Sequence, residues 1–173
     1  MQNINIGNFY FIDDAFLNKY PNLMKNKTPD SNGIRHDRPC FAAFQDIKIK
    51  DIFWLIPISS DIQKYTQEYN KKLNNQKAKG IQNPKCDTIY FGKIHGSCSV
   101  FLLQNMFPVI LRYISGGNSY KINGIPVTAE IKTENDVIKK AKKLLKLAIH
   151  NNPGIFKQDV LKMYADLCDE LKS

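Results

Sequence analysis

The chain has 173 residues, of which 43% are hydrophobic and 11% aromatic, enough for one buried core and too apolar for global disorder. Its 25 Lys and Arg residues outnumber 16 Asp and Glu residues, and the resulting net charge of +9 favours a phosphate-rich partner. The longest apolar runs, 52–58 and 100–103, are too short to cross a bilayer, and the N-terminus lacks a signal-peptide pattern. We therefore expect a single domain over residues 1–173 that acts in the cytoplasm, away from membranes.

Four cysteines lie far apart along the sequence, at Cys40, Cys86, Cys98 and Cys168. The sequence has no C-x-x-C pair and no close Cys/His spacing. This pattern favours reduced thiols over a structural zinc site, so we expect neither a metal nor a cofactor.

Apolar periodicity, caps and turn residues together predict the elements of the fold. In chain order, we expect strands at 8–12, 40–44, 52–58, 88–94 and 99–103, and helices at 13–20, after 60, from 133 and over 156–171. This order is typical of an α+β domain, in which a small, mostly antiparallel sheet or barrel carries inserted and appended helices.

Local signals refine this outline. The apolar run 53–56 predicts a central strand buried on both faces, and Pro57 should end that strand because it has no N–H to donate. Ser60 and Thr133 each precede a helical pattern and are expected to be N-caps. His95-Gly96 lies between two strand candidates and predicts a hairpin turn.

The best candidate site lies where the strand at 52–58 passes into the following helix. Backbone N–H groups and the helix dipole would point there at a bound phosphate. Ser59 and Ser60 add hydroxyl groups, and Lys64 projects from the first helical turn. Two simpler roles stay open: Ser60 as a plain N-cap, and Lys64 as a solvated helix lysine.

A second candidate precedes the strand at 40–44. Arg35, His36 and Arg38 place two guanidinium groups and an imidazole within a few residues, which suits a phosphate clamp. His36 could take part in acid–base chemistry or be an ordinary loop histidine. Tyr10 could donate a hydroxyl or stack on a base, or be an ordinary core tyrosine.

Between residues 62 and 93, seven lysines face only Glu68 and Asp87, so that this segment alone is strongly basic. Such a segment is typical of a polyphosphate partner, although a merely solvated surface is the alternative. The residues expected to bind RNA are Arg35, His36, Arg38, Phe41, Lys71, Lys72, Lys77, Lys79 and Lys85.

Motifs of many enzyme classes are absent from the sequence, which has no phosphate loop, G-x-G-x-x-G, H-E-x-x-H or G-x-S-x-G. Nothing resembles the carboxylate cluster of a two-metal nuclease. RNA supplies its own nucleophile, however, because its 2′-hydroxyl can attack the adjacent phosphate. A protein then needs only to position the chain, move two protons and stabilise an anionic phosphorane. If the protein cuts nucleic acid, the sequence therefore favours metal-independent cleavage of RNA.

Taken together, these motifs resemble the ToxN/AbiQ/CptN family, the endoribonuclease toxins of bacterial type III toxin–antitoxin systems, and the CptN branch most closely. The resemblance extends over residues 8–170 and combines several motifs in order. They are Asn8–Ile12, Arg38–Phe41, Leu55–Ser60 with Lys64, Asp87–Gly92 and Leu102–Val109.

The resemblance implies a fold like that of the Kid/MazF toxins, with a twisted, partly closed antiparallel sheet surrounded by helices. It implies cleavage of single-stranded, adenine-rich mRNA to 2′,3′-cyclic phosphate and 5′-hydroxyl ends. It also implies that the toxin processes and is inhibited by a small pseudoknotted antitoxin RNA in a closed assembly, with no protein partner required. The family's active-site positions fall at Ser59, Ser60 and Lys64, with Tyr10, Arg38 and Phe41 as neighbours.

The chain departs from the family pattern at one place. Many relatives have Pro and one or two lysines directly after the Ser/Thr pair, whereas Asp61, Ile62 and Gln63 stand here before a single lysine. An acid at position 61 would disfavour a nearby phosphate unless it points away. Two other functions stay open: a non-catalytic RNA-binding relative, and a basic ribosome-associated or mobile-element protein.

Overall fold

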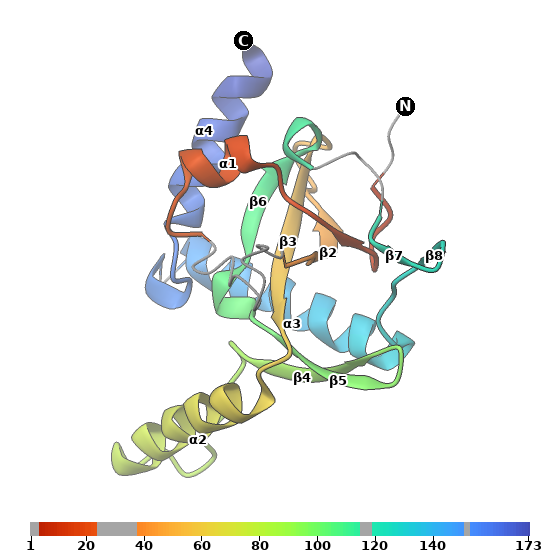
Figure 1. The fold of residues 1–173 in the computed structure, drawn as a ribbon. Helices are drawn as coiled ribbons and strands as arrows, with labels where there is room; N and C mark the ends of the chain where they lie inside the picture. The colour runs from red at the N-terminus through yellow and green to blue at the C-terminus, as the bar shows by residue number, and fades with distance from the viewer. Residues whose placement is uncertain (1–3, 24–37, 115–118, 151–152) are drawn as a thin grey trace.

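A computed structural model describes residues 4–23, 38–114, 119–150 and 153–173 (Figure 1). It confirms the α+β class. The elements are β1 (Phe9–Tyr10), α1 (Asp14–Lys19), β2 (Cys40–Gln45), β3 (Ile52–Ser59), α2 (Ile62–Ala78), β4 (Tyr90–Ile94), β5 (Ser97–Phe101), β6 (Phe107–Ile110), β7 (Lys121–Ile122), β8 (Ile125–Pro126), α3 (Ile131–His150) and α4 (Val160–Lys172). Within these ranges, no helix has both the length and the apolar character needed to cross a membrane.

Strand β3 is the centre of a six-stranded antiparallel sheet. Five strands follow the order β1-β2-β3-β5-β4, and the sixth, β6, pairs with β3. Its first edge pairs with β2 along most of its length. Its second edge pairs with β6 over Ile52–Leu55 and with β5 only at Ile58 and Ser59. The sheet therefore ends in β1 and β4 and does not close into a barrel.

Pro57 lies inside β3, opposite Cys40, and not at the end of the strand as the sequence predicted. Its carbonyl accepts a hydrogen bond from Leu102 N at 3.0 Å, on the edge where β6 gives way to β5. The N–H and C=O of one residue in an antiparallel strand face the same edge, so the missing N–H falls where the ladder is already interrupted. This position explains why a proline is tolerated in a central strand.

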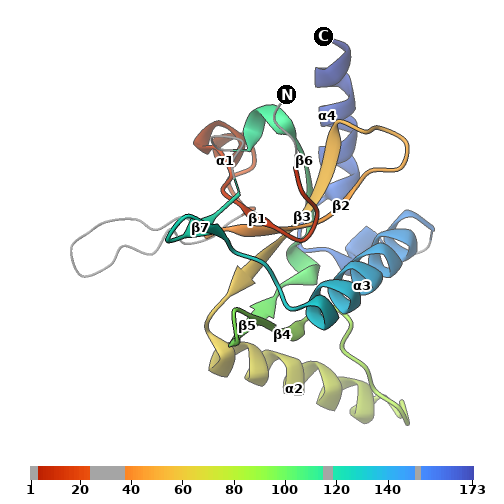
Figure 2. The same cartoon turned by 90° about the vertical axis from the view of Figure 1, so that its right-hand side faces the viewer.

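The side chains of β3 enter two separate cores, as expected for a strand buried on both faces. Trp54 and Ile56 join the cluster that α3 covers with Val137, Ala141, Leu144 and Ala148. Phe53 and Leu55 join the cluster that contains Phe16 of α1 and Met163 and Leu167 of α4. Figure 2 shows α2 with β4 and β5 at one end of the molecule and α4 at the other.

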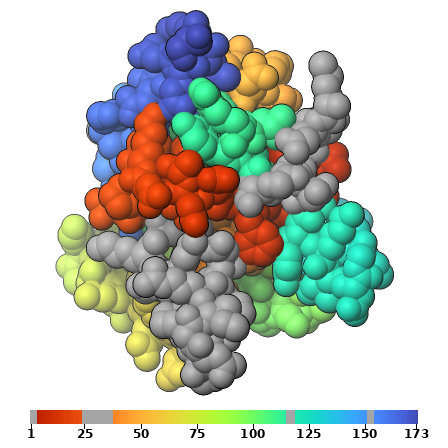
Figure 3. All heavy atoms as spheres, turned by 45° about the horizontal axis from the view of Figure 1, so that its top comes forward, coloured from red at the N-terminus to blue at the C-terminus, as the bar shows by residue number. Residues whose placement is uncertain are grey.

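The N- and C-terminal helices are joined through the carboxylate of Glu170. Lys19 of α1 and Arg112 form ion pairs with it, the latter at 3.1 Å, and Tyr113 donates to it from 2.7 Å. Helices α1 and α4 accordingly lie side by side on the surface (Figure 3). The partners are only partly buried, so their main effect is to fix the register of α4 against the sheet rather than to add much stability.

Helix α3 begins at Ile131, so Thr133 is not its N-cap as the sequence predicted. Thr133 is buried, and its hydroxyl accepts a hydrogen bond from Lys93 N at 3.1 Å. The preceding Gly92 lies so close that a β-carbon there would be 2.3 Å from Thr133 Cγ2. Thr133 therefore serves to dock α3 onto β4, and this tertiary contact overrides the local capping signal.

Gly92→Ala should lower the free energy of unfolding by about 1–3 kcal/mol, because the new methyl group overlaps the Thr133 side chain. Thr133→Ser removes the Thr133 methyl group but keeps the hydroxyl that bonds Lys93, and should recover part of that loss in the double variant. Urea unfolding of the single and double variants measures both effects. Strictly additive losses would contradict the predicted contact.

Candidate active site

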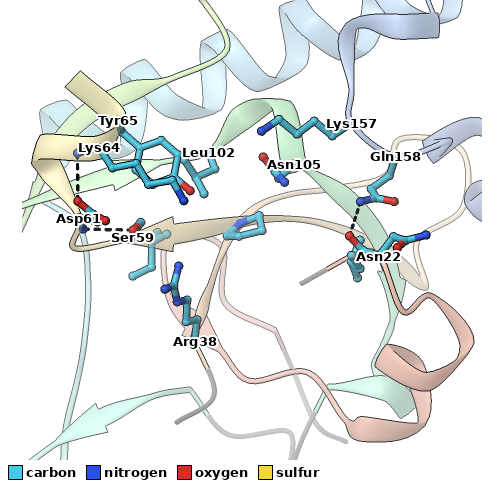
Figure 4. A pocket seen from close by; sticks show the side chains of 13 residues that line it. Asn22, Arg38, Ser59, Asp61, Lys64, Tyr65, Leu102, Asn105, Lys157 and Gln158 are labelled. Carbon is cyan, nitrogen blue, oxygen red and sulfur yellow. Dashed lines mark hydrogen bonds between the residues drawn. The ribbon is translucent and has the colours of Figure 1, made fainter. Parts of the chain in front are cut away.

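A pocket of about 730 Å³ opens where β3 passes into α2 (Figure 4). Pro57, Ile58 and Ser59 of β3 line one wall, and Leu102 and the 3₁₀ turn before β6 line another. Asn22, Leu23 and Arg38 complete it, together with Lys157 and Gln158 of the chain that enters α4. The pocket thus lies at the gap between β5 and β6 on the second edge of β3.

The turn between β3 and α2 is held by two side chains. Ser59 is only 5% exposed, and its Oγ accepts a hydrogen bond from Asp61 N at 3.2 Å. The Asp61 carboxylate in turn accepts one from Lys64 N at 3.0 Å and is therefore the N-cap of α2. The sequence placed this cap at Ser60, which is instead exposed and does not line the pocket. The cap of α2 is therefore one residue later than the sequence predicted.

The acid at position 61 has a structural role at the mouth of the pocket. Its carboxylate lies at the N-terminus of α2, where the helix dipole favours a negative charge. It is nevertheless among the residues that line the pocket, and Figure 4 shows it beside Ser59 and Lys64. A phosphate bound here would meet one carboxylate as well as the surrounding cations.

Three cations line the pocket: Arg38, Lys64 and Lys157. Lys64 Nζ lies 5.4 Å from the centre of the Tyr65 ring. Lys157 Nζ is 3.8 Å from a Glu68 carboxylate oxygen that also accepts a hydrogen bond from Gln104 at 2.8 Å. Within the described ranges, neither Arg38 nor Lys64 forms an ion pair. The lining is therefore net positive and suits an anion.

Uncharged polar side chains complete the lining of the pocket. Asn105 Oδ1 is buried and has no hydrogen-bond partner among the described residues, although an unpaired buried acceptor costs about 1–3 kcal/mol. Gln158 Nε2 donates to Asn22 O at 2.7 Å and closes the far end. Burial raises the pKa of the Tyr65 hydroxyl, against the opposing effect of Arg38, so this group remains a donor at neutral pH.

Sequence reasoning missed several of these residues. Asn105 lies within the Leu102–Val109 motif, so that motif carried a signal for it. Lys157 and Gln158 stand about a hundred residues from β3, and nothing in their local sequence marks them. Tyr65 was likewise not among the residues expected in the site.

Two of the expected site residues are instead core residues. Tyr10 is 1% exposed, and its hydroxyl accepts from Asn5 N at 2.8 Å. Phe41 is fully buried in ring contact with Phe9 and Phe101. Neither lines the pocket, because β1 and β2 turn both side chains into the two cores. Arg35 and His36 lie outside the described residues.

Helix α2 carries the expected basic surface away from the body of the molecule (Figure 1). Tyr65, near its start, is buried with Ile89, Val100 and Leu102, and Tyr69 and Leu73 pack against this cluster. The helix end is tied to the returning chain by Gln76, which exchanges hydrogen bonds of 2.7 and 2.9 Å with the Lys85 backbone. The lysines of this surface are Lys71, Lys72, Lys77, Lys79 and Lys85.

The lysines of α2 and α3 differ in their charge partners. Asp87 forms ion pairs with Lys140 at 2.6 Å and Lys143 at 2.8 Å. The hydrogen bonds from these two lysines lower the pKa of Asp87 to about 2. Among the described residues, none of the five α2-surface lysines forms an ion pair. The α2 surface therefore keeps its full positive charge among the described residues.

Within the part of the chain that the structure describes, no three His, Cys, Asp or Glu side chains come together as a possible metal-binding group. No protein-family model matches the chain, and no curated protein matches its sequence. Only the residues that line the pocket therefore indicate which ligand it could bind.

Asp61→Ala should lower the free energy of unfolding by about 1 kcal/mol, because it removes the acceptor of the Lys64 N–H. Asp61→Asn keeps an oxygen acceptor and should retain most of the stability. Ser60→Ala, at an exposed position that does not cap, should change it by less than about 0.5 kcal/mol. Urea denaturation compares the three variants. A loss at Ser60 that equals the loss at Asp61 would mean that both side chains cap the helix.

Proposed function

We propose that the protein is a metal-independent endoribonuclease whose active site is the pocket at the end of β3. The observation that supports this most directly is the presence of Ser59, Lys64 and Arg38 in one net-positive pocket. Ser59 and Lys64 both lie at the junction of β3 and α2, whereas Arg38 comes from the chain before β2. A hydroxyl donor and two cations can stabilise the anionic phosphorane that forms when the RNA 2′-hydroxyl attacks the adjacent phosphate.

In this reaction the 2′-oxygen attacks the adjacent phosphorus, and the O2′–P bond forms as the P–O5′ bond breaks. The 2′-hydroxyl proton passes to water and the leaving 5′-oxygen takes a proton from water, which gives 2′,3′-cyclic phosphate and 5′-hydroxyl ends. Lys64 and Arg38 stabilise the negative charge of the phosphorane. The Ser59 oxygen accepts from Asp61 N, so its hydrogen remains available for a phosphate oxygen.

The middle of the pocket suits the base and phosphate that flank the cleaved bond. The Tyr65 ring and the apolar wall offer contact to a base, and the Asn105 amide can pair with the N6 and N7 atoms of adenine. Such a bond would satisfy the unpartnered Oδ1. Lys157 lies within reach of a neighbouring phosphate. Single-stranded, adenine-rich mRNA is thus the proposed substrate.

The resemblance to the ToxN/AbiQ/CptN toxins extends this proposal to a biological setting. The protein would act in the bacterial cytoplasm as a type III toxin, and a pseudoknotted antitoxin RNA would hold it inactive. The α2 surface, with five lysines lacking described ion-pair partners, is the proposed docking surface for that RNA. The Asp61 carboxylate in the pocket favours the second candidate, a relative that binds RNA without cutting it.

Purified protein freed of RNA should cleave single-stranded RNA in excess EDTA. The products should carry 2′,3′-cyclic phosphate and 5′-hydroxyl ends, because the nucleophile is the substrate's own 2′-oxygen. Gel analysis with end-specific enzymatic treatment reads out both properties, and RNA with a 2′-deoxy residue at the cut site should resist. A strict need for Mg²⁺, or 5′-phosphate products, would refute the mechanism. Binding without cleavage would support the second candidate.

Lys64→Met should reduce the single-turnover cleavage rate by about 10²–10³, the usual effect of losing one donor to a transition-state oxyanion. The melting temperature should change little, because an exposed first-turn lysine contributes little to stability. Lys121→Met, at an exposed position of β7 that does not line the pocket, is the control with the same charge change. Equal rates for the two variants would exclude Lys64 from the site.

Replacing Lys71, Lys72, Lys77 and Lys79 with Gln should flatten the dependence of log K for RNA binding on log salt. Each lost phosphate contact reduces the slope by about 0.7–0.9. The matched control replaces Lys139, Lys142, Lys143 and Lys146 of α3, which changes the net charge equally. Filter binding at several salt concentrations compares the two. A larger effect in the α3 variant would place the RNA on α3.

A further inference from the structure

A second hollow of about 470 Å³ lies between the end of α3, the start of α4 and the connection from β2 to β3. It shares no lining residue with the pocket at the end of β3. Its apolar walls remain open to solvent: Ile47 is 82% exposed, Ile149 56% and Leu161 37%. Exposed apolar residues that gather around one groove are typical of a binding surface, whereas single ones are not.

The floor of this groove is built from buried aromatic side chains. The Trp54 and Tyr164 rings stack with centres 6.0 Å apart and planes 14° apart. Asp46 fixes both rings by accepting from Trp54 Nε1 at 3.2 Å and from the Tyr164 hydroxyl at 3.0 Å. The same carboxylate also accepts from the backbone of Lys48 and Ile49. The groove is therefore preformed, and its one lining acid is fully engaged by internal donors.

The rim of the groove is positive. Lys48, Lys142, Lys146 and His150 surround the apolar walls. Lys142 Nζ lies 5.6 Å from the Phe44 ring centre, and a His150 ring nitrogen bonds the Lys146 carbonyl at 2.8 Å. In the described part of the chain, none of these three lysines has a carboxylate partner. An apolar groove with unneutralised cations around it is complementary to an acidic amphipathic segment.

We propose that this groove binds an acidic amphipathic helix of a partner protein. Apolar side chains of that helix would contact Ile47, Ile149 and Leu161, while its carboxylates would face the rim lysines. A second copy of this chain is a poor occupant, because two chains of net charge +9 repel each other. RNA would leave the aliphatic side chains uncovered, and Trp54, at 2% exposure, offers no ring face for a base.

The test uses the full chain and a labelled synthetic peptide with Leu at positions i, i+3, i+4 and i+7 and Glu on its other face. A scrambled peptide of the same composition is the peptide control. Fluorescence anisotropy should show saturable 1:1 binding that is at least about tenfold tighter for the amphipathic peptide. Ile149→Asp should weaken it at least about tenfold. Ile131→Asp, which introduces the same charge at an 80%-exposed position on α3, should leave it unchanged.

Equal binding of both peptides, or equal affinity in both aspartate variants, would overturn the proposal, and so would an absence of binding. A 12-nucleotide RNA provides the remaining arm. If Ile149→Asp weakened binding of this RNA but not of the peptide, the groove would be a nucleic-acid surface instead. None of the peptide outcomes depends on whether the protein cleaves RNA.

Discussion

The change of hydrogen-bonding partner along one edge of β3 determines much of this structure. Up to Leu55 the edge is bonded to β6, and from Ile58 it is bonded to β5. The chain that connects β5 with β6 must therefore leave and re-enter the sheet beside Pro57, the residue that has no N–H to donate there. Strands β6 and β5 therefore separate beside Pro57, and the pocket that Ser59, Leu102 and Asn105 line lies where they separate. The pocket is thus a direct consequence of the sheet topology.

Charge is distributed unevenly over this framework. Asp87 forms ion pairs with two lysines of α3, and Glu170 forms ion pairs with Lys19 of α1 and with Arg112 after β6. Helix α2 has no comparable acid near its far end, and it begins directly at the pocket. A polyanion drawn to α2 would consequently be led along the helix towards Lys64 and Arg38. The groove at the end of α3 carries its own positive rim around an apolar centre and is suited to a different class of partner.

The sequence was most informative where one local pattern decided the structure. The apolar run 53–56 correctly indicated a central strand, and the periodicity after residue 133 correctly indicated the long helix α3. It failed at Pro57 and Thr133, where a tertiary contact overrode a local preference, and at Ser60, where the neighbouring Asp61 caps the helix instead. In the pocket, the strand-to-helix junction was foreseeable from Ser59 and Lys64. Lys157 and Gln158 were not, because only the packing of α4 brings them there.

The pocket draws its walls from almost the whole length of the chain, from Asn22 to Gln158. A ribosome adds about 5–20 residues per second, so the roughly 100 residues between Pro57 and Lys157 take about 5–20 s to make. Through that interval the growing chain holds the β3 wall without the opposite one. The pocket of the proposed ribonuclease would therefore be incomplete until Lys157 and Gln158 have been made.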